Sequence, residues 1–301
     1  MQVVSRTALT AAGYTWAQIQ ANLDGGRWRA LNERVLCRHN GPLTRREQWA
    51  AAYLSCPQPA ALAGPTAVEF WGIRGHEVTD VHVVVAPGAR VGRVAAVPVV
   101  AHQSRRMSGR DLLAFDDVSV TEAHCSVIDA CAWTADPAAS ARLLIAGVQQ
   151  RRVWPDRLAR ALARAGQVRH AALLRRLLRD LSGGAEAVSE IEFLAFCRRH
   201  RLPRPQLQHR DGAGRRRRYL DARFDGSGGR DVFVEVDGGV HLTLATRWKD
   251  TRKDNWSSIA GKLVLRFPSV AIYTDDPEAV AQIRAALGLV RTTPGHDPGW
   301  C

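Results

Sequence analysis

YLDARFDGSGGRDVFVEVDGGVH, the stretch Tyr219–His241, decides the fold of the C-terminal third of this chain. Two runs of alternating side chains flank a glycine-rich segment at 226–230, which is the pattern of a β-hairpin. Because successive side chains of a strand point to opposite faces, Glu235 and Asp237 share one face and the intervening valines occupy the other. With the turn at 226–230, we expect Asp221 to lie directly opposite Glu235.

The three carboxylates of this hairpin predict a site for a hard divalent cation. Residues directly opposite each other across a sheet are about 4.5–5.5 Å apart at Cβ. Acidic groups at that spacing repel unless a cation neutralises them, and Mg²⁺ or Mn²⁺ prefers carboxylate oxygens. Asp221 and Glu235 are therefore the expected ligands, and Asp237 is a third ligand or a water-orienting group. This pattern favours phosphodiester chemistry.

His241 and Glu235 could each belong to the site or have a purely structural role. His241 follows two glycines that let the chain turn back toward the carboxylates, where an imidazole could act as base or as acid for the leaving group. A lone histidine is more often structural. Glu235, in contrast, lies among valines, where a carboxylate is costly unless it is used. The group as a whole favours a site over a coincidence.

The charge of the chain favours a polyanionic partner. The 301 residues include 42 Lys and Arg against 29 Asp and Glu, a formal net charge of +13. That excess indicates nucleic acid first and an anionic membrane surface second, although arginine-rich usage also follows genomic base composition. No apolar run approaches about 20 residues, and the first residues do not read as a signal peptide. We therefore expect no membrane association and a cytoplasmic protein.

The six cysteines are scattered, without a C-x-x-C pair or a histidine at zinc-finger spacing. We expect neither a zinc site nor a disulfide framework, and reduced thiols as in a cytosolic protein. Cys197, inside an apolar helical pattern, is expected to be a core residue.

Residues 1–74 are expected to form a winged helix-turn-helix domain. The predicted order is a helix, a tight turn at Gly13, a second helix with Thr15 as its N-cap, and a short basic β-ribbon. The expected bounds are Ser5–Ala12 and Trp16–Leu23 for the helices, Arg27–Leu31 and Arg34–Arg38 for the ribbon, and Leu43–Cys56 and Thr66–Trp71 for two helices beneath it.

The second helix and the ribbon carry the candidate nucleic-acid contacts of this domain. Amide side chains can reach base edges, and guanidinium groups suit phosphates. The candidate base contacts are Gln18, Gln20 and Asn22, and the candidate phosphate contacts are Arg27, Arg29 and Arg38. The alternative is a polar, solvated helix face, but the basic ribbon beside it favours DNA.

Residues 75–184 read as an α/β and helical middle domain in which the sequence indicates no site. Strands are expected at Val81–Val85 and Ala95–His102, and helices at Leu143–Gln150, Asp156–Ala165 and His170–Leu181. Ser182-Gly-Gly184 is the expected linker to the next domain.

Residues 185–289 form the third expected domain, ahead of a tail at 290–301. The pattern predicts a mixed sheet with helices packed on it, so the whole chain belongs to the α/β (α+β) class. The expected bounds are helix Ser189–His200, strands Gln206–Arg210, Arg216–Phe224 and Asp231–Asp237, helix Trp248–Gly261, strands Leu263–Phe267 and Val270–Tyr273, and helix Pro277–Leu287.

The third domain carries a series of motifs in order along the chain. They are Glu190 thirteen residues before Pro203, Tyr-Leu-Asp221, Val-Glu235-Val-Asp237-Gly-x-x-His241, Asp250-x-x-Lys253-x-Asn255 and Val-Leu-Arg266-Phe. Together they resemble a Vsr-like domain, a relative of the very-short-patch-repair endonucleases within the PD-(D/E)xK nuclease fold. The resemblance covers about Ser189–Leu287 and implies a restriction-endonuclease-like mixed sheet flanked by helices.

This resemblance implies roles for the acidic residues. It implies Asp221 and Glu235 as the metal ligands, with Asp237 in the place where many such nucleases carry lysine. It also implies a helical acid, which Glu190 matches best and for which Glu192 is the fallback. His241, Asp250 and Asn255 stand at positions that the family pattern marks.

The resemblance also implies two basic contacts to nucleic acid. Lys253 stands where arginine is usual and Ser257 where leucine is usual, so the helix departs from the family pattern at these two positions. Arg266 is implied as a phosphate contact, and a salt bridge at the end of its strand is the alternative.

The N-terminal domain resembles a second family. Ala12-Gly13-Tyr-Thr-x-x-x-Ile19 followed by Gly26-Arg27-Trp28-Arg29 is similar to the winged-helix domain of AbiEi-type antitoxins. That resemblance implies a fold that binds DNA and represses its own operon. At 32–35, Asn-Glu-Arg-Val departs from the small glycine turn usual before the second strand of the wing.

Two functions are consistent with these observations. The first is a DNA-binding protein whose winged helix places a Mg²⁺- or Mn²⁺-dependent endonuclease-like domain on double-stranded DNA. The second is a transcriptional regulator or antitoxin, with its own operator or a cognate toxin as partner, whose nuclease-like domain has no turnover. The lysine missing from the nuclease motif favours the second. An RNA- or tRNA-directed factor is a third alternative.

Overall fold

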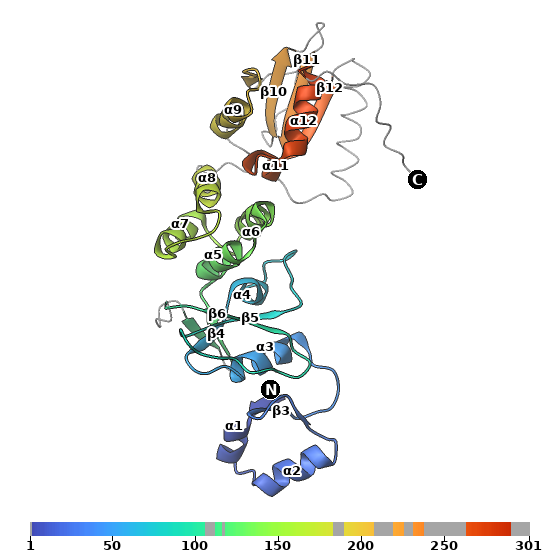
Figure 1. The fold of residues 1–301 in the computed structure, drawn as a ribbon, viewed down its shortest axis with the longest axis vertical. Coiled ribbons are helices and arrows are strands. Elements are labelled where there is room, and N and C mark those ends of the chain that lie inside the picture. Colours follow the sequence, from blue (N-terminus) through green and yellow to red (C-terminus); the bar gives the residue numbers. More distant parts are fainter. Residues whose placement is uncertain are drawn as a thin grey trace, which may run out of the picture. The chain divides into compact units, whose positions relative to one another are not determined.

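The computed structural model describes residues 2–105, 112–115, 118–182, 190–207, 219–225, 231–237 and 263–289. For Tyr219, Leu220, Asp221 and Asp237 only the backbone is described. The chain divides into two compact units, an N-terminal unit of residues 1–171 and a C-terminal unit of residues 172–301. The described residues form a mixed α/β fold of eleven helices and three sheets (Figure 1).

The N-terminal unit begins with two short helices and a small antiparallel sheet of order β1-β3-β2. Its elements are β1 (Val3–Ser5), α1 (Arg6–Ala11), α2 (Trp16–Asp24), β2 (Arg29–Ala30) and β3 (Val35–Cys37). The predicted N-cap is confirmed, because the Thr15 hydroxyl accepts from the N–H of Gln18 and the Gln18 side chain accepts from the N–H of Thr15. The two helices and the ribbon are confirmed, and β1 is an additional strand.

A five-stranded mixed sheet of order β6-β5-β4-β8-β7 forms the centre of this unit. Its strands are β4 (Ala60–Leu62), β5 (Val81–Val85), β6 (Val99–Gln103), β7 (Leu112–Phe115) and β8 (Val118–Thr121). β4 pairs with β5 in antiparallel and with β8 in parallel fashion. Since β4 precedes residue 75 and its partners follow it, the sheet joins residues of the first two expected domains.

Five further helices belong to the N-terminal unit: α3 (Arg45–Leu54), α4 (Gly64–Phe70), α5 (Ala123–Trp133), α6 (Pro137–Gln149) and α7 (Pro155–Arg164). The predicted helices α3, α4 and α7 are confirmed. α6 begins earlier than predicted because Asp136 caps it and Pro137 occupies its first turn. The sequence pattern misses α5 because most of its residues are buried, so it shows no polar face.

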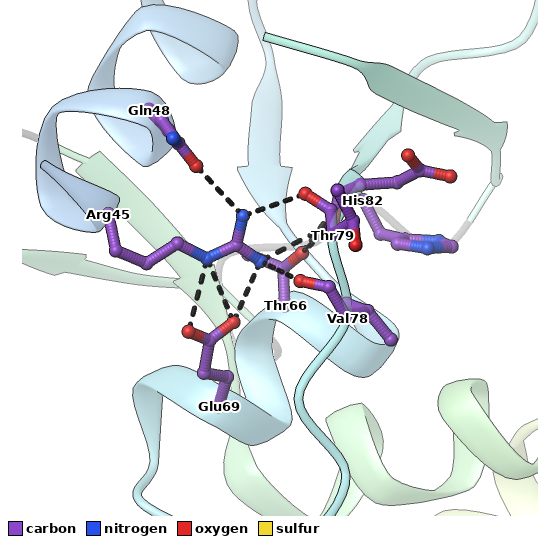
Figure 2. Close-up of polar contacts among 8 residues, drawn as sticks. Arg45, Gln48, Thr66, Glu69, Val78, Thr79 and His82 are labelled. Atoms are coloured by element: carbon purple, nitrogen blue, oxygen red, sulfur yellow. Dashed lines mark hydrogen bonds and ion pairs between the residues drawn. The ribbon is translucent and has the colours of Figure 1, made fainter. Parts of the chain in front are cut away.

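Arg45 ties α3 to α4 and to the segment before β5 (Figure 2). Its Nε and Nη2 donate to the Glu69 carboxylate at 2.8–3.1 Å. Its Nη1 donates to the carbonyl oxygen of Thr79 at 2.9 Å and to the side chain of Gln48 at 3.0 Å, and Nη2 donates to the carbonyl oxygen of Val78 at 2.7 Å. A single guanidinium therefore fixes two helices and a loop against the sheet.

The C-terminal unit is built on a four-stranded sheet of order β12-β11-β10-β9, in which β11 and β12 are parallel and the other pairs antiparallel. Its elements are α8 (Ala171–Ser182), which begins at the last residue of the N-terminal unit, α9 (Glu190–Arg199), β9 (Gln206–Leu207), β10 (Tyr219–Asp225), β11 (Asp231–Asp237), β12 (Leu263–Pro268), α11 (Ser269–Tyr273) and α12 (Pro277–Ala286). Phe193, Phe196, Phe224 and Val234 are fully buried in its core.

Two predicted strands differ from the structure. Val270–Tyr273 was expected to be a strand and is part of helix α11, in which Thr274 N–H donates to the carbonyl oxygen of Val270. A short apolar run does not distinguish a strand from a buried helical turn. The strand expected at Ala95–His102 begins only at Val99, because Ala96 has a φ of 60°. The predicted helix Trp248–Gly261 lies outside the described residues.

None of the helices in the described part of the chain has the length and apolar character that a bilayer crossing requires.

Candidate functional site

The β10–β11 hairpin has the predicted register. Asp221 pairs with Glu235 and Asp225 pairs with Asp231. The two residues expected to hold a metal are therefore directly opposite each other on neighbouring strands, where Cβ atoms are about 4.5–5.5 Å apart.

The two faces of β11 also follow the prediction. Val232, Val234 and Val236 are completely buried, whereas Phe233 and Glu235 are half-buried on the other face. The valines pin the strand against the core, so the face that carries Glu235 is set by packing rather than by the turn alone. If β11 shifted by one residue, the carboxylate of Glu235 would turn to the face that the valines now bury.

Arg266 is the residue that engages Glu235. The parallel pairing of β11 with β12 places Arg266 beside Glu235, and its Nε donates to Glu235 Oε2 at 2.8 Å. The Glu235 side chain is only 14% exposed and that of Arg266 is 26% exposed, so the ion pair is largely shielded from water. Of the two alternatives for Arg266, the structure contains the salt bridge.

The other predicted members of this site are described less fully. Asp237 is the last residue of β11, where its backbone pairs with Tyr219 and Pro268. His241 and Lys253 lie outside the described residues, as do Asp250, Asn255 and Ser257. Among the side chains that the structure describes, no three His, Cys, Asp or Glu residues gather as a metal site would require.

The two candidates for the helical acid differ in their surroundings. Glu190 is the first residue of α9 and is half-buried. Glu192 is buried, and its Oε1 accepts ion pairs from Arg199 at 2.9 Å and Arg176 at 3.3 Å. Because Arg199 also binds Asp275 at 2.9 Å, Glu192 belongs to a network that ties α8 and α9 to the end of α11. These bonds engage Glu192 within the structure of the unit.

The predicted base-reading amides of α2 make local hydrogen bonds. Gln18 Oε1 accepts from the Thr15 N–H in the capping box. Gln20 Nε2 donates to Asp24 at 2.8 Å, and Asn22 Nδ2 donates to the carbonyl oxygen of Gln18 at 2.8 Å. These three amides therefore organise the helix, and a base contact would have to replace part of that bonding.

The predicted phosphate-binding arginines fall into two groups. Arg27 donates to the Asn22 side chain at 2.8 Å and to the Ala21 carbonyl oxygen at 3.1 Å, so it closes the end of α2. Arg29 donates to the carbonyl oxygen of Gly41 at 3.0 Å and is half-buried. Both arginines therefore donate to backbone carbonyl oxygens of the first expected domain.

Arg38 differs from them because it lies exposed over two aromatic rings. Its guanidinium carbon is 5.8 Å from the Tyr14 ring centroid and 5.5 Å from that of Trp28, and the two rings are 5.6 Å apart. Its Nη2 also donates to the Tyr14 hydroxyl at 3.4 Å, so the two rings hold an exposed guanidinium in an orientation in which it can bind a phosphate. The sequence pattern identifies Arg38 but not the aromatic support, because Tyr14 is separated from it by 24 positions.

A histidine pair in the N-terminal unit was not predicted. His82 Nδ1 and His102 Nε2 on neighbouring strands are 3.0 Å apart, and the His102 ring stacks on Trp133 with centroids 3.4 Å apart and 4° between the planes. Burial, together with the neighbouring His82, lowers the pKa of His102 to about 4. Burial also lowers the pKa of His82. The pair is neutral near pH 7 and is hydrogen-bonded through one shared proton.

Comparison with protein-family models gives no match to the chain, and comparison with curated proteins gives no significant match.

Proposed function

We propose that this protein binds double-stranded DNA through its N-terminal helices and ribbon, as a winged helix does, and cleaves phosphodiesters with a divalent metal held in an endonuclease-like C-terminal unit. The observation that carries the proposal is the pairing of Asp221 with Glu235 in the middle of the four-stranded sheet. Two acids opposite each other repel unless a cation neutralises them, and a metal can fill that role beside the guanidinium of Arg266.

The residues present suit Mg²⁺ or Mn²⁺. Asp221 and Glu235 supply carboxylate oxygens from adjacent strands, and Asp237 lies two residues beyond Glu235 on the same strand. Two or three carboxylates are enough for Mg²⁺, which keeps several of its waters. When bound, the metal would polarise the phosphate and activate water. The protein would contribute ligands that a packed sheet holds in place, with Glu235 oriented by its hydrogen bond from Arg266.

The N-terminal half supports a nucleic-acid partner. The capped helix α2 and the ribbon β2–β3 have the order of a winged helix-turn-helix, and Arg38 is presented on Tyr14 and Trp28. The net charge of +13 adds an unspecific attraction to a polyanion.

Metal titration with plasmid cleavage tests the proposal. Glu235→Gln keeps the shape of the side chain but removes its charge, so calorimetric Mg²⁺ or Mn²⁺ binding and plasmid nicking should both fall to background. Glu278→Gln, an exposed glutamate of α12 in the same unit, is the matched control and should keep both. Wild-type protein that leaves diverse DNA and RNA uncut with either metal would overturn the nuclease function.

The ion pair between Glu235 and Arg266 favours a second candidate function, a regulator or antitoxin-like repressor whose C-terminal unit does not cleave. The guanidinium already neutralises Glu235 and occupies one of its oxygens. Arg266→Met distinguishes the two functions. If a metal competes with Arg266 for the carboxylates, the variant should bind Mn²⁺ more tightly than wild type. If the pair is structural, neither protein should bind the metal, and operator binding should survive both Arg266→Met and Glu235→Gln.

A further inference from the structure

The sequence around helix α7 is strongly and uniformly basic. Residues 151–169 contain six arginines and a single acid, Asp156. All six are exposed; they are Arg151, Arg152, Arg157, Arg160, Arg164 and Arg169. A merely solvated helix usually interleaves charges of both signs, since opposite charges three or four residues apart stabilise it. A surface of one sign therefore indicates a partner of the other sign.

Three of these arginines form a continuous stripe along α7. Arg157, Arg160 and Arg164 are spaced three and four residues apart, which places them on one side of a helix over about 10 Å. Another side of α7 is apolar and buried, with Leu158, Ala161 and Leu162 in the core. Arg157 and Arg160 of this α7 arginine stripe lie exposed on a helix that is packed against the core, and Arg164 is exposed but also reaches Cys125.

Contacts with α5 and with Trp154 orient the stripe. The N–H of Trp154 donates to His124 Nε2 at 3.2 Å, and Arg164 Nη2 donates to Cys125 Sγ at 3.7 Å, so both ends of α7 are anchored. Trp154 is 56% exposed, and the Arg157 guanidinium carbon is 5.8 Å from its ring centroid. The ring limits the freedom of Arg157 before any partner binds, which lowers the entropy cost of binding.

We propose that the α7 arginine stripe is a second DNA-backbone contact, separate from the N-terminal helices and ribbon. A span of about 10 Å matches about three nucleotides of one strand, which carry one phosphate every 3.4 Å along the helix axis. A lipid surface fits less well, because the apolar face of α7 is already buried and cannot insert into a bilayer. The inference rests on the proposed function because its ligand is the same DNA.

Salt-dependent DNA binding of the full-length protein tests the stripe. The test variant is Arg157→Gln with Arg160→Gln, and the matched control is Arg90→Gln with Arg93→Gln, two exposed arginines of the same unit with the same spacing. Affinity for a labelled random-sequence duplex is measured by fluorescence anisotropy at several salt concentrations. Loss of two phosphate contacts should reduce the slope of log K against log salt by about 1.8, whereas the control should keep the wild-type slope.

Two further variants separate charge from structure. Arg157→Lys with Arg160→Lys retains both charges and should restore most of the slope, and Trp154→Ala should weaken binding because Arg157 loses its orienting ring. A test variant that behaves like the control, while wild type binds the duplex, overturns the stripe and leaves the proposed function standing. Wild type that does not bind the duplex overturns both. Unchanged duplex binding with selective loss of affinity for structured RNA or for anionic vesicles assigns the stripe to another partner.

Discussion

At the scale of single residues, the His82–His102 pair shows how burial changes the chemistry of an ordinary side chain. The two rings share one hydrogen bond, and His102 is stacked on Trp133. A proton added to His102 would change which ring nitrogens can donate and accept in that hydrogen bond. It would also place a positive charge beside the imidazole of His82. The half-buried position therefore favours the neutral pair, with the pKa of His102 lowered to about 4.

This lowered pKa predicts a loss of stability in mild acid. The ordinary pKa of histidine is 6.5 and that of folded His102 is about 4, so between these values the unfolded chain binds a proton that the folded protein does not. The free energy of unfolding should therefore be retained above pH 6.5 and decrease as the pH falls toward 4. His102→Phe keeps a planar ring on Trp133 but cannot titrate, so its stability should decrease less over the same range.

Urea unfolding at pH 7 and at pH 4.5, followed by tryptophan fluorescence, measures the effect. The carboxylates of the protein titrate in both wild type and variant, and their contributions cancel in the comparison. Equal losses of stability in the two proteins would contradict a special role of His102.

At the scale of elements, a glycine decides how closely α4 approaches α5. Gly64, at the start of α4, has a φ of 51°, and a Cβ atom there would be 2.1 Å from Cζ3 of Trp133, the last residue of α5. Gly75 also has a positive φ, 85°, but a Cβ atom there would meet open space. Both positions require a positive φ, but only at Gly64 would an added Cβ atom clash with another side chain.

Gly64→Ala should therefore destabilise the N-terminal unit much more than Gly75→Ala. Each substitution costs about 1 kcal/mol for a left-handed alanine. Only Gly64→Ala also displaces an aromatic ring in a packed interface, which adds about 1–3 kcal/mol. Thermal unfolding of the two variants measures the difference, and similar losses would show that α4 and α5 can separate without cost.

The elements also show which local patterns predict structure. The hairpin of β10 and β11 follows from its glycine-rich turn and its alternation, and its register is confirmed at Asp221 and Glu235. The helix α2 follows from its cap at Thr15. α5 and α11 do not follow, because a buried helix without a polar face lacks the 3.6-residue period, and the four residues Val270–Tyr273 are too few to distinguish a turn of helix from a strand.

At the scale of the whole molecule, the site residues that the sequence predicts are those defined by strand periodicity. Glu235 and its opposite residue Asp221 can be located from alternation and turn length. Arg266 can be located only as a basic residue in a strand, since its contact with Glu235 depends on the parallel register of β11 and β12. In the same way, the support of Arg38 by Tyr14 and the ties of Glu192 to Arg176 arise from tertiary packing that local patterns do not encode.

The two compact units predict two separate thermal transitions. Each unit has its own buried core, with Leu62 in the central sheet of the N-terminal unit and Ile272 in α11 of the C-terminal unit, both completely buried. Leu62→Ala and Ile272→Ala remove comparable side chains, and each should lower only the transition of its own unit, by about 5–15 °C. Differential scanning calorimetry of the wild type and both variants measures this directly. A single transition that moves in both variants would mean that the units unfold together, and the proposed metal site and the proposed DNA-binding surfaces would then share one free energy of unfolding.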